Sequence, residues 1–200
     1  PPFQAVDQKI KEKLLASGLT PDKMNIPLRK MRAEADLFRE ENLPLLTEER
    51  KLGSAYNKIL GAQTVEWEGQ ELTLARLWFL IQTPEREMRR ELWSLLAERQ
   101  LEDRKAINDL WVKQMEVRRQ LAANAGKTDY RAYRWQQMLR LDYSPEDSQE
   151  FVQAVADVVV PAANRVYANY MERMGIEKLR PWDLLNNQLT LSLPALKAYD

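Results

Sequence analysis

The chain has 200 residues, in which 30 Lys plus Arg balance 30 Asp plus Glu, so its formal net charge is zero. Without a positive field to attract polyanions we expect no nucleic-acid binding, and without an acidic excess we expect a folded chain. Cys and His are both absent. Their absence excludes disulfides, thiolate or His-based catalysis, and zinc sites built from Cys or His within these residues.

A low content of Gly and Pro, 6 and 10 residues respectively, favours long helices over tightly turned β architecture. The longest apolar run extends from Leu77 to Ile81, far short of the ~20 residues that cross a membrane. The polar amino end is unlike a signal peptide. We therefore expect a soluble cytoplasmic protein with no membrane partner, and the missing initiator Met suggests a piece of a longer polypeptide.

Apolar residues at helical spacing predict three helices in the first part of the chain, over residues 3–16, 27–38 and 47–60. In the first of these, Val6, Ile10 and Leu14 share one face. Three segments also carry a hydroxyl residue followed by Pro and an acid, a combination that suits the start of a helix. We predict helix starts at Thr20-Pro21-Asp22, Thr83-Pro84-Glu85 and Ser144-Pro145-Glu146, the last with Asp147 placed for a capping box.

Apolar and polar residues alternate on either side of Glu68-Gly69, which predicts a β-hairpin. Thr73 is then expected to cap a helix over 74–82. The absence of Gly and further Pro over 84–125 predicts one continuous helix of about 60 Å at ~1.5 Å per residue. Its apolar residues span a wide arc, and we expect an exposed apolar patch from Leu92, Leu95, Leu96, Leu110, Trp111 and Val112.

A shorter helix with Tyr130, Tyr133 and Met138 is expected after Thr128. The helix that begins at Ser144 is predicted to kink at Pro161, with Phe151, Val152, Val155, Val158 and Val159 facing inward. Residues 179–183 should be extended because Arg180 precedes Pro, and residues 189–193 could form a strand.

The predicted fold class is all-α, with long antiparallel helices and one small β-hairpin, as part of a larger and mainly helical channel-forming fold. We treat the chain as a single helical region and expect helices over 1–62, the hairpin over 63–73, long helices over 74–175 and an extended tail over 176–200.

Glu98, Glu102 and Asp103 lie about one helical turn apart and could form a carboxylate metal site. Helical di-metal sites generally also use His, and the basic residues Arg99, Arg104 and Lys105 are adjacent. A solvated face of ion pairs is therefore favoured over a metal site.

Two basic clusters suit phosphate by charge. Each has acidic residues interleaved with it, and a neutralised surface is the favoured interpretation of both. The clusters are Arg86, Arg89 and Arg90, beside Glu85, Glu87 and Glu91, and Arg29, Lys30 and Arg32, opposite Glu34 and Asp36.

Aromatic residues gather around the short helix, at Tyr130, Tyr133, Trp135 and Tyr143. Such rings can line a ligand cleft, although core packing is the favoured interpretation. The glycines are too widely spaced for a dinucleotide or P-loop fingerprint.

Three motifs follow one another in order: an Ala/Asn-x-x-Gly step at 123–126, Tyr130-x-x-Tyr133, and Asp142-Tyr-Ser-Pro-Glu-Asp147. On these motifs the sequence resembles the oligoendopeptidase F/thimet oligopeptidase family of zinc metallopeptidases. The likeness to sequences of this family extends to Val158-Val-Val-Pro161 and Leu179-Arg-Pro-Trp-Asp183. It covers about residues 34–183. It lies in the region that precedes the catalytic domain.

The resemblance implies that the full-length enzyme uses zinc, held by His-Glu-x-x-His and a downstream Glu, to hydrolyse oligopeptides. It assigns no catalytic or metal residue to this chain and leaves its substrate-binding residues open. We expect the chain alone to bind no zinc and to be inactive. Its partners would be the peptide substrate and its own carboxyl-terminal catalytic half. The helices would form a wall of a channel that excludes folded proteins. The alternative is a non-catalytic helical scaffold or protein-interaction domain.

Overall fold

The structure is a computed structural model that describes residues 2–185, with side chains from residue 6 onward. The chain divides into two compact units. Unit 1 contains the residues up to Tyr56 together with Asn108–Glu150, and unit 2 contains Asn57–Ile107 together with the residues from Phe151 onward. Each unit has a hydrophobic core of its own.

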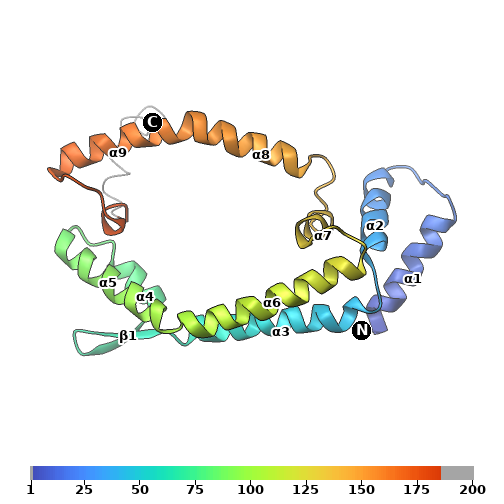
Figure 1. Ribbon diagram of the computed structural model, residues 1–200, viewed down its shortest axis with the longest axis horizontal. Helices are drawn as coiled ribbons and strands as arrows, with labels where there is room; N and C mark the ends of the chain where they lie inside the picture. Colours follow the sequence, from blue (N-terminus) through green and yellow to red (C-terminus); the bar gives the residue numbers. More distant parts are fainter. Residues whose placement is uncertain (1, 186–200) are drawn as a thin grey trace. The chain divides into compact units, whose positions relative to one another are not determined.

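Unit 1 consists of helices (Figure 1). It contains α1 (Pro2–Ala16), α2 (Asn25–Leu37) and α7 (Tyr130–Gln137) in full. It also contains the larger parts of α3 (Asn42–Gly61), α6 (Arg104–Asn124) and α8 (Pro145–Ala154). Its core is formed by Leu37, Leu121, Ala122, Ala125 and Tyr133.

Helix α1 confirms the predicted helix over residues 3–16. Its predicted apolar face is not a buried one, because Val6 and Ile10 are 56% and 62% exposed. Among the side chains of this helix that the structure describes, from residue 6 onward, the buried one is Gln8, whose Nε2 donates to Glu12 at 2.8 Å. The apolar spacing therefore predicts the helix, but it does not identify the side chain that is buried.

Two amide side chains, of which Asn42 is buried, join α6 to α3 inside unit 1. Asn42 is the first residue of α3, and its Oδ1 accepts a hydrogen bond from Asn124 Nδ2 at 2.8 Å. Two residues later Gly126 has a φ of 68°, and the amide of Lys127 donates to the carbonyl of Ala122 at 2.9 Å. Helix α6 therefore ends in a Schellman motif that requires the left-handed conformation at Gly126.

Unit 2 combines a β-hairpin with helices. Strand β1 (Thr64–Trp67) pairs antiparallel with β2 (Gln70–Thr73), and α4 (Leu74–Leu80) and α5 (Arg86–Glu102) follow. The last part of the unit contains the π-helical η1 (Val155–Val159), α9 (Val160–Met174) and the 3₁₀ turn η2 (Pro181–Asp183). Its core is formed by Val65, Leu77, Ile81, Leu92 and Leu96.

The predicted hairpin is confirmed at Glu68-Gly69. These two residues have φ values of 50° and 74°, the positive pair that a type I′ turn requires. Thr73 caps α4 as predicted, because its Oγ1 accepts a hydrogen bond from the amide of Arg76 at 3.3 Å. The hairpin and α4 thus follow from local sequence alone.

The single helix predicted over residues 84–125 is wrong, because α5 and α6 are separated by Asp103. The Asp103 backbone, with φ −87° and ψ 1°, leaves the helical region. Its carboxylate accepts hydrogen bonds from Gln63 Nε2 at 2.9 Å and Arg99 Nη1 at 2.8 Å. Asp is a weak helix former, and these partners hold it where the helix ends without Gly or Pro.

The exposed patch predicted on that helix is also partly wrong. Leu92 and Leu96 are buried in the core of unit 2, whereas Trp111 and Val112 are exposed. The wide apolar arc therefore reflects two helices with two different packed faces.

Of the three predicted helix starts, the one at Ser144 is confirmed. The Ser144 amide donates to Asp147 Oδ2 at 2.7 Å, and the Asp147 amide donates to Ser144 Oγ at 3.1 Å, which completes a capping box. The start predicted at Thr20 is wrong, because α2 begins at Asn25 without a side-chain cap. At Thr83-Pro84-Glu85 a helix does start, with Glu85 at the N-cap position of α5, but the Thr83 hydroxyl donates to the Glu85 carboxylate and does not cap the helix.

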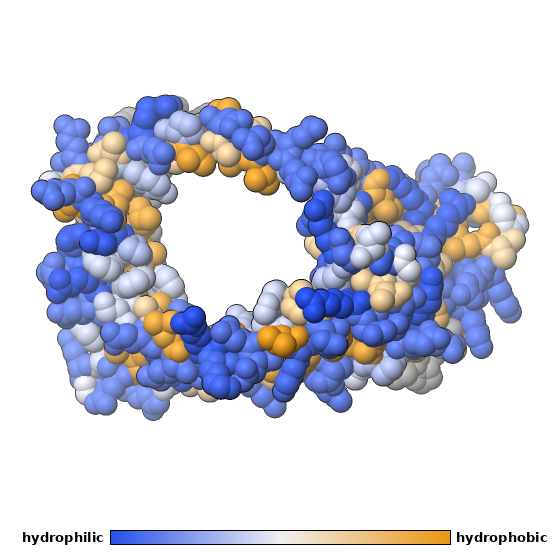
Figure 2. Space-filling model, in the orientation of Figure 1, coloured by the Kyte–Doolittle hydropathy of each residue, from blue (hydrophilic) through white to orange (hydrophobic). Residues whose placement is uncertain are grey.

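Valines predicted to face inward along the last long helix are exposed instead. Phe151, Val152 and Val158 are 70%, 65% and 69% exposed, and Figure 2 shows hydrophobic residues at the surface along the segment labelled α8 and α9 in Figure 1. A π-helical turn, η1, directly precedes the segment at Pro161 where a kink is predicted. The spacing was correct for a helix, but no described element covers this face.

The segment predicted to be extended at residues 179–183 closes into the turn η2 after Arg180, which is itself extended with φ −119° and ψ 161°. The possible strand over 189–193 lies outside the described residues. Among the helices of the described range, none is long and apolar enough to cross a membrane.

Candidate functional site

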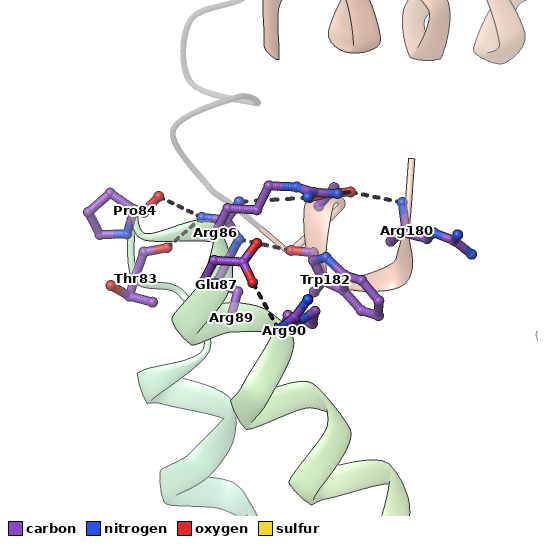
Figure 3. Close-up of polar contacts among 9 residues, drawn as sticks. Thr83, Pro84, Arg86, Glu87, Arg89, Arg90, Arg180 and Trp182 are labelled. Atoms are coloured by element: carbon purple, nitrogen blue, oxygen red, sulfur yellow. Dashed lines mark hydrogen bonds and ion pairs between the residues drawn. The ribbon is translucent and has the colours of Figure 1, made fainter. Parts of the chain in front are cut away.

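A buried carboxylate on η2 connects this turn to the start of α5, and Figure 3 shows the labelled residues around it. Asp183, on η2, is fully buried and accepts hydrogen bonds from Arg86 Nε at 2.8 Å, Arg86 Nη2 at 3.0 Å and the Arg180 amide at 2.9 Å. Arg89 Nη2 lies 3.9 Å from the same carboxylate. Burial alone raises the pKa of Asp183, but these hydrogen bonds and charges outweigh it and hold the pKa below its usual value.

Arg89 is 1% exposed and is held almost entirely by backbone carbonyls. Its Nε donates to Trp182 at 2.9 Å, and its Nη1 donates to Thr83 at 2.9 Å and to Pro84 at 2.8 Å (Figure 3). Trp182 also packs against Trp93 with ring centroids 5.4 Å apart. We therefore assign this cluster a structural role, because its cations are already saturated.

The phosphate site considered at Arg86, Arg89 and Arg90 is thus not formed. Neutralisation was the favoured interpretation, but only Arg90 uses a nearby acid, with Nη2 3.0 Å from Glu87. The other two use Asp183, which is 97 residues from Arg86. Sequence spacing missed Asp183, although it ends the family-like string at 179–183.

Two of the three carboxylates considered for a metal site, Glu102 and Asp103, are engaged in ion pairs. Arg99 Nη1 lies 3.4 Å from Glu102 and 2.8 Å from Asp103. Among the residues that the structure describes, no group of three or more Asp or Glu could hold a metal ion. With no His or Cys in the sequence, the residues present do not fit a zinc site.

The other basic cluster, Arg29, Lys30 and Arg32, does not pair with the acids expected opposite it. Arg29 Nη1 pairs with Asp142 at 2.6 Å, whereas the acids expected opposite it pair elsewhere. Glu34 forms an ion pair with Lys11 at 2.6 Å, and Asp36 forms one with Lys127 at 2.8 Å.

The predicted aromatic cluster divides between core and surface. Tyr133 is buried in the core of unit 1, as core packing predicts, and stacks on Tyr130 with centroids 5.9 Å apart. Trp135 and Tyr143 meet edge to face at 5.2 Å. Tyr130 and Trp135 also line a pocket, so that the alternative of a ligand cleft applies to these two rings.

This pocket has a volume of about 760 Å³, within the range of small-ligand sites. It lies entirely in unit 1, between the carboxyl-terminal part of α6 and helix α7. Its walls combine apolar and basic side chains, namely Met115, Arg119, Ala122, Ala123, Lys127, Thr128, Asp129, Tyr130, Arg131, Arg134, Trp135, Met138 and Arg140.

Tyr130 is fixed in the pocket wall by an ionic network. Its hydroxyl donates to Glu49 Oε1 at 2.9 Å, and the same oxygen accepts from Arg118 Nε at 2.9 Å. The Arg118 guanidinium also lies over the Tyr130 ring at 5.0 Å. Burial and the hydrogen bond to Glu49 raise the pKa of Tyr130, so the phenol stays neutral. No local signal pointed to Glu49, which is far away in sequence.

The chain matches a protein-family model and several solved structures. A family model described as peptidase family M3 matches residues 79–199, more than half of the chain. A search of curated protein sequences finds no match. The two solved structures described next cover 92% of this chain, and the chain spans about a third of their length.

One of these structures is described as an oligoendopeptidase F from Bacillus anthracis, with 22% identity, a TM-score of 0.80 and 35% of its own chain covered. The other is described as PZ peptidase A with an inhibitor, with 23% identity, a TM-score of 0.87 and 34% of its own chain covered. These likenesses confirm the helical fold with one small hairpin.

Proposed function

Since the chain belongs to peptidase family M3, we propose that it is the amino-terminal helical part of a zinc metalloendopeptidase that hydrolyses oligopeptides. The match of the family model over residues 79–199 carries this proposal. The fold likeness supports it, because the chain spans about a third of the two peptidase structures.

The role we assign to this part is a wall of the substrate channel. Long helices present rigid, extended surfaces, and such surfaces restrict which polypeptides reach a catalytic centre. An unfolded oligopeptide can enter a narrow channel, whereas a folded protein cannot. The sequence supplies neither His nor Cys, so in this proposal the zinc ligands belong to the catalytic part of the enzyme.

The coding sequence downstream of Asp200 provides the first test. A His-Glu-x-x-His motif about one domain downstream is expected, because two His one helical turn apart bind zinc and the Glu acts as base. The encoded full-length protein should then cleave a quenched fluorescent oligopeptide. A variant with Gln in place of that Glu serves as the inactive control.

Size selection tests the channel wall. The full-length enzyme should cleave a short peptide and leave the same sequence intact when it is embedded in a folded protein. A reading frame that closes without the zinc motif would overturn the peptidase proposal and favour the helical scaffold or protein-interaction domain. Equal cleavage of both substrates would overturn the role of the channel wall alone.

A further inference from the structure

The pocket between α6 and α7 holds more positive charge than its neighbours neutralise. Five basic residues line it, and Asp129 is its one acidic lining residue. The Asp129 carboxylate is already engaged, because its Oδ1 accepts the amide of Ala132 at 2.7 Å and caps α7. In a chain with no net charge, this local excess stands out.

Two of the basic residues have carboxylate partners. Lys127 lies 2.8 Å from Asp36, and Arg131 lies 3.7 Å from Glu146. These contacts neutralise part of the positive charge that lines the pocket.

Three guanidinium groups lack a carboxylate partner among the residues that the structure describes. Arg134 donates to the neutral Gln137 Oε1 at 2.6 Å, and Arg140 lies over the ring of Trp135 at 4.8 Å. Arg119 has neither an ion pair nor a hydrogen bond within the described range, and it is exposed. Guanidinium groups retain their charge and form paired hydrogen bonds with carboxylates.

Apolar side chains complete the pocket. Met115 and Met138 line it together with the ring of Trp135. Trp135 is held in place because its Nε1 donates to the carbonyl of Tyr143 at 3.1 Å. An apolar wall beside cations that lack a carboxylate partner suits a ligand that carries both a negative charge and an apolar group.

We propose that this pocket binds a peptide carboxylate and seats the neighbouring apolar side chain against Trp135 and the two methionines. The identification of the ligand as a peptide rests on the proposed function. The carboxylate comes either from an acidic side chain or from the carboxyl terminus. Arg140 covers one face of Trp135, which leaves less of this ring for stacking by a nucleotide base.

Calorimetric titration of the 200-residue chain with three short peptides tests the proposal without zinc or hydrolysis. The first peptide carries two glutamates and a leucine and has an amidated end. The second has glutamines instead of glutamates and keeps the amide, and the third has glutamines and a free carboxyl terminus. We expect the second peptide to bind most weakly, and binding by the first or the third identifies the source of the carboxylate.

Variants then place the binding in the pocket. Arg119→Gln and Arg134→Gln should each weaken binding of the acidic peptide by about threefold to tenfold, because each removes one charged hydrogen-bond donor. Arg32→Gln is the matched control, since Arg32 is exposed on α2 of the same unit and lies outside the pocket. Far-UV circular dichroism verifies that each variant keeps its helices.

Three results would overturn the inference: equal binding of all three peptides, no binding of any of them, or pocket variants that bind like Arg32→Gln. Displacement of the acidic peptide by inorganic phosphate at equal or lower concentration would assign the pocket to phosphate instead. All of these outcomes are independent of peptidase activity, so they are distinguishable from a failure of the proposed function.

Discussion

Arg86 and Asp183, 97 residues apart in the sequence, form a two-point ion pair in which Nε and Nη2 donate to the two carboxylate oxygens at 2.8 and 3.0 Å. The carboxylate is fully buried, whereas the Arg86 side chain is 35% exposed. The pair fastens η2 to the first turn of α5. Arg89 completes the attachment by donating to the carbonyl of Trp182.

Asp183→Asn should destabilise unit 2 by about 2–4 kcal/mol, because it leaves the buried Arg89 without its counter-charge. Urea unfolding followed by tryptophan fluorescence measures this, since Trp93 and Trp182 pack beside the pair. Asp22→Asn, at an exposed residue, is the matched control and should leave the midpoint unchanged. Equal midpoints for Asp183→Asn and the wild type would contradict the structural role of the cluster.

The same pair predicts a pH dependence. The pKa of Asp183 is lower in the folded chain than its usual value, so the unfolded chain binds more protons as the solution becomes acidic. The contribution of Asp183 is complete above the unfolded pKa of about 4 and is lost as pH falls through the lower folded pKa. The stability difference between wild type and Asp183→Asn should therefore shrink below about pH 4, as measured by urea unfolding at several pH values. A difference in unfolding free energy between the two proteins that stays constant below pH 4 would contradict this prediction.

The features that were predicted correctly have their determinants close together in sequence. The hairpin depends on Glu68-Gly69, and the start of α8 depends on Ser144 and Asp147. The features that were missed depend on distant partners. Asp103 ends α5 with the help of Gln63, 40 residues away. An uninterrupted run of helix formers carries no sign of such a contact.

The site shows the same division. The aromatic residues around α7 could be identified from sequence as a cluster, because helical spacing brings Tyr130 and Tyr133 together. The environment of each ring could not be predicted from sequence, because Glu49 and the core of unit 1 determine which ring is buried and which lines the pocket. For the same reason, the sequence does not show that Arg119 and Arg134 lack carboxylate partners, which is the property that makes them candidates for binding an anion.

The same substitution, Gly→Ala, should change the free energy of unfolding in opposite directions at two glycines. A Cβ at Gly126 or Gly53 would meet nothing within 4 Å, but Gly126 has a φ of 68° and Gly53 lies inside α3. Gly126→Ala should therefore destabilise the chain by about 1 kcal/mol through backbone strain. Gly53→Ala should stabilise it by about 0.5–1 kcal/mol, because Ala favours a helix interior. Urea unfolding monitored by circular dichroism measures both, and shifts of the same sign would contradict the assigned conformations.

The exposed apolar face of η1 and α9, with its adjoining residues on α8, should make the isolated chain prone to self-association. Phe151 and Val158 are 70% and 69% exposed, and a contiguous apolar surface of this kind binds dyes and other apolar surfaces. A net charge of zero provides little repulsion between molecules. The chain should therefore bind a hydrophobic dye and self-associate in light scattering.

Phe151→Glu combined with Val158→Glu should reduce dye fluorescence by roughly half and lower the apparent mass, because two charges interrupt the apolar face. Leu19→Glu is the control: Leu19 is 63% exposed but lies between α1 and α2, so its substitution adds a charge without touching this face. If the control reduces dye binding as much as the double variant, net charge rather than the α9 face governs association. A wild-type chain that stays monomeric and dye-silent at high concentration would contradict the prediction and favour a self-sufficient scaffold.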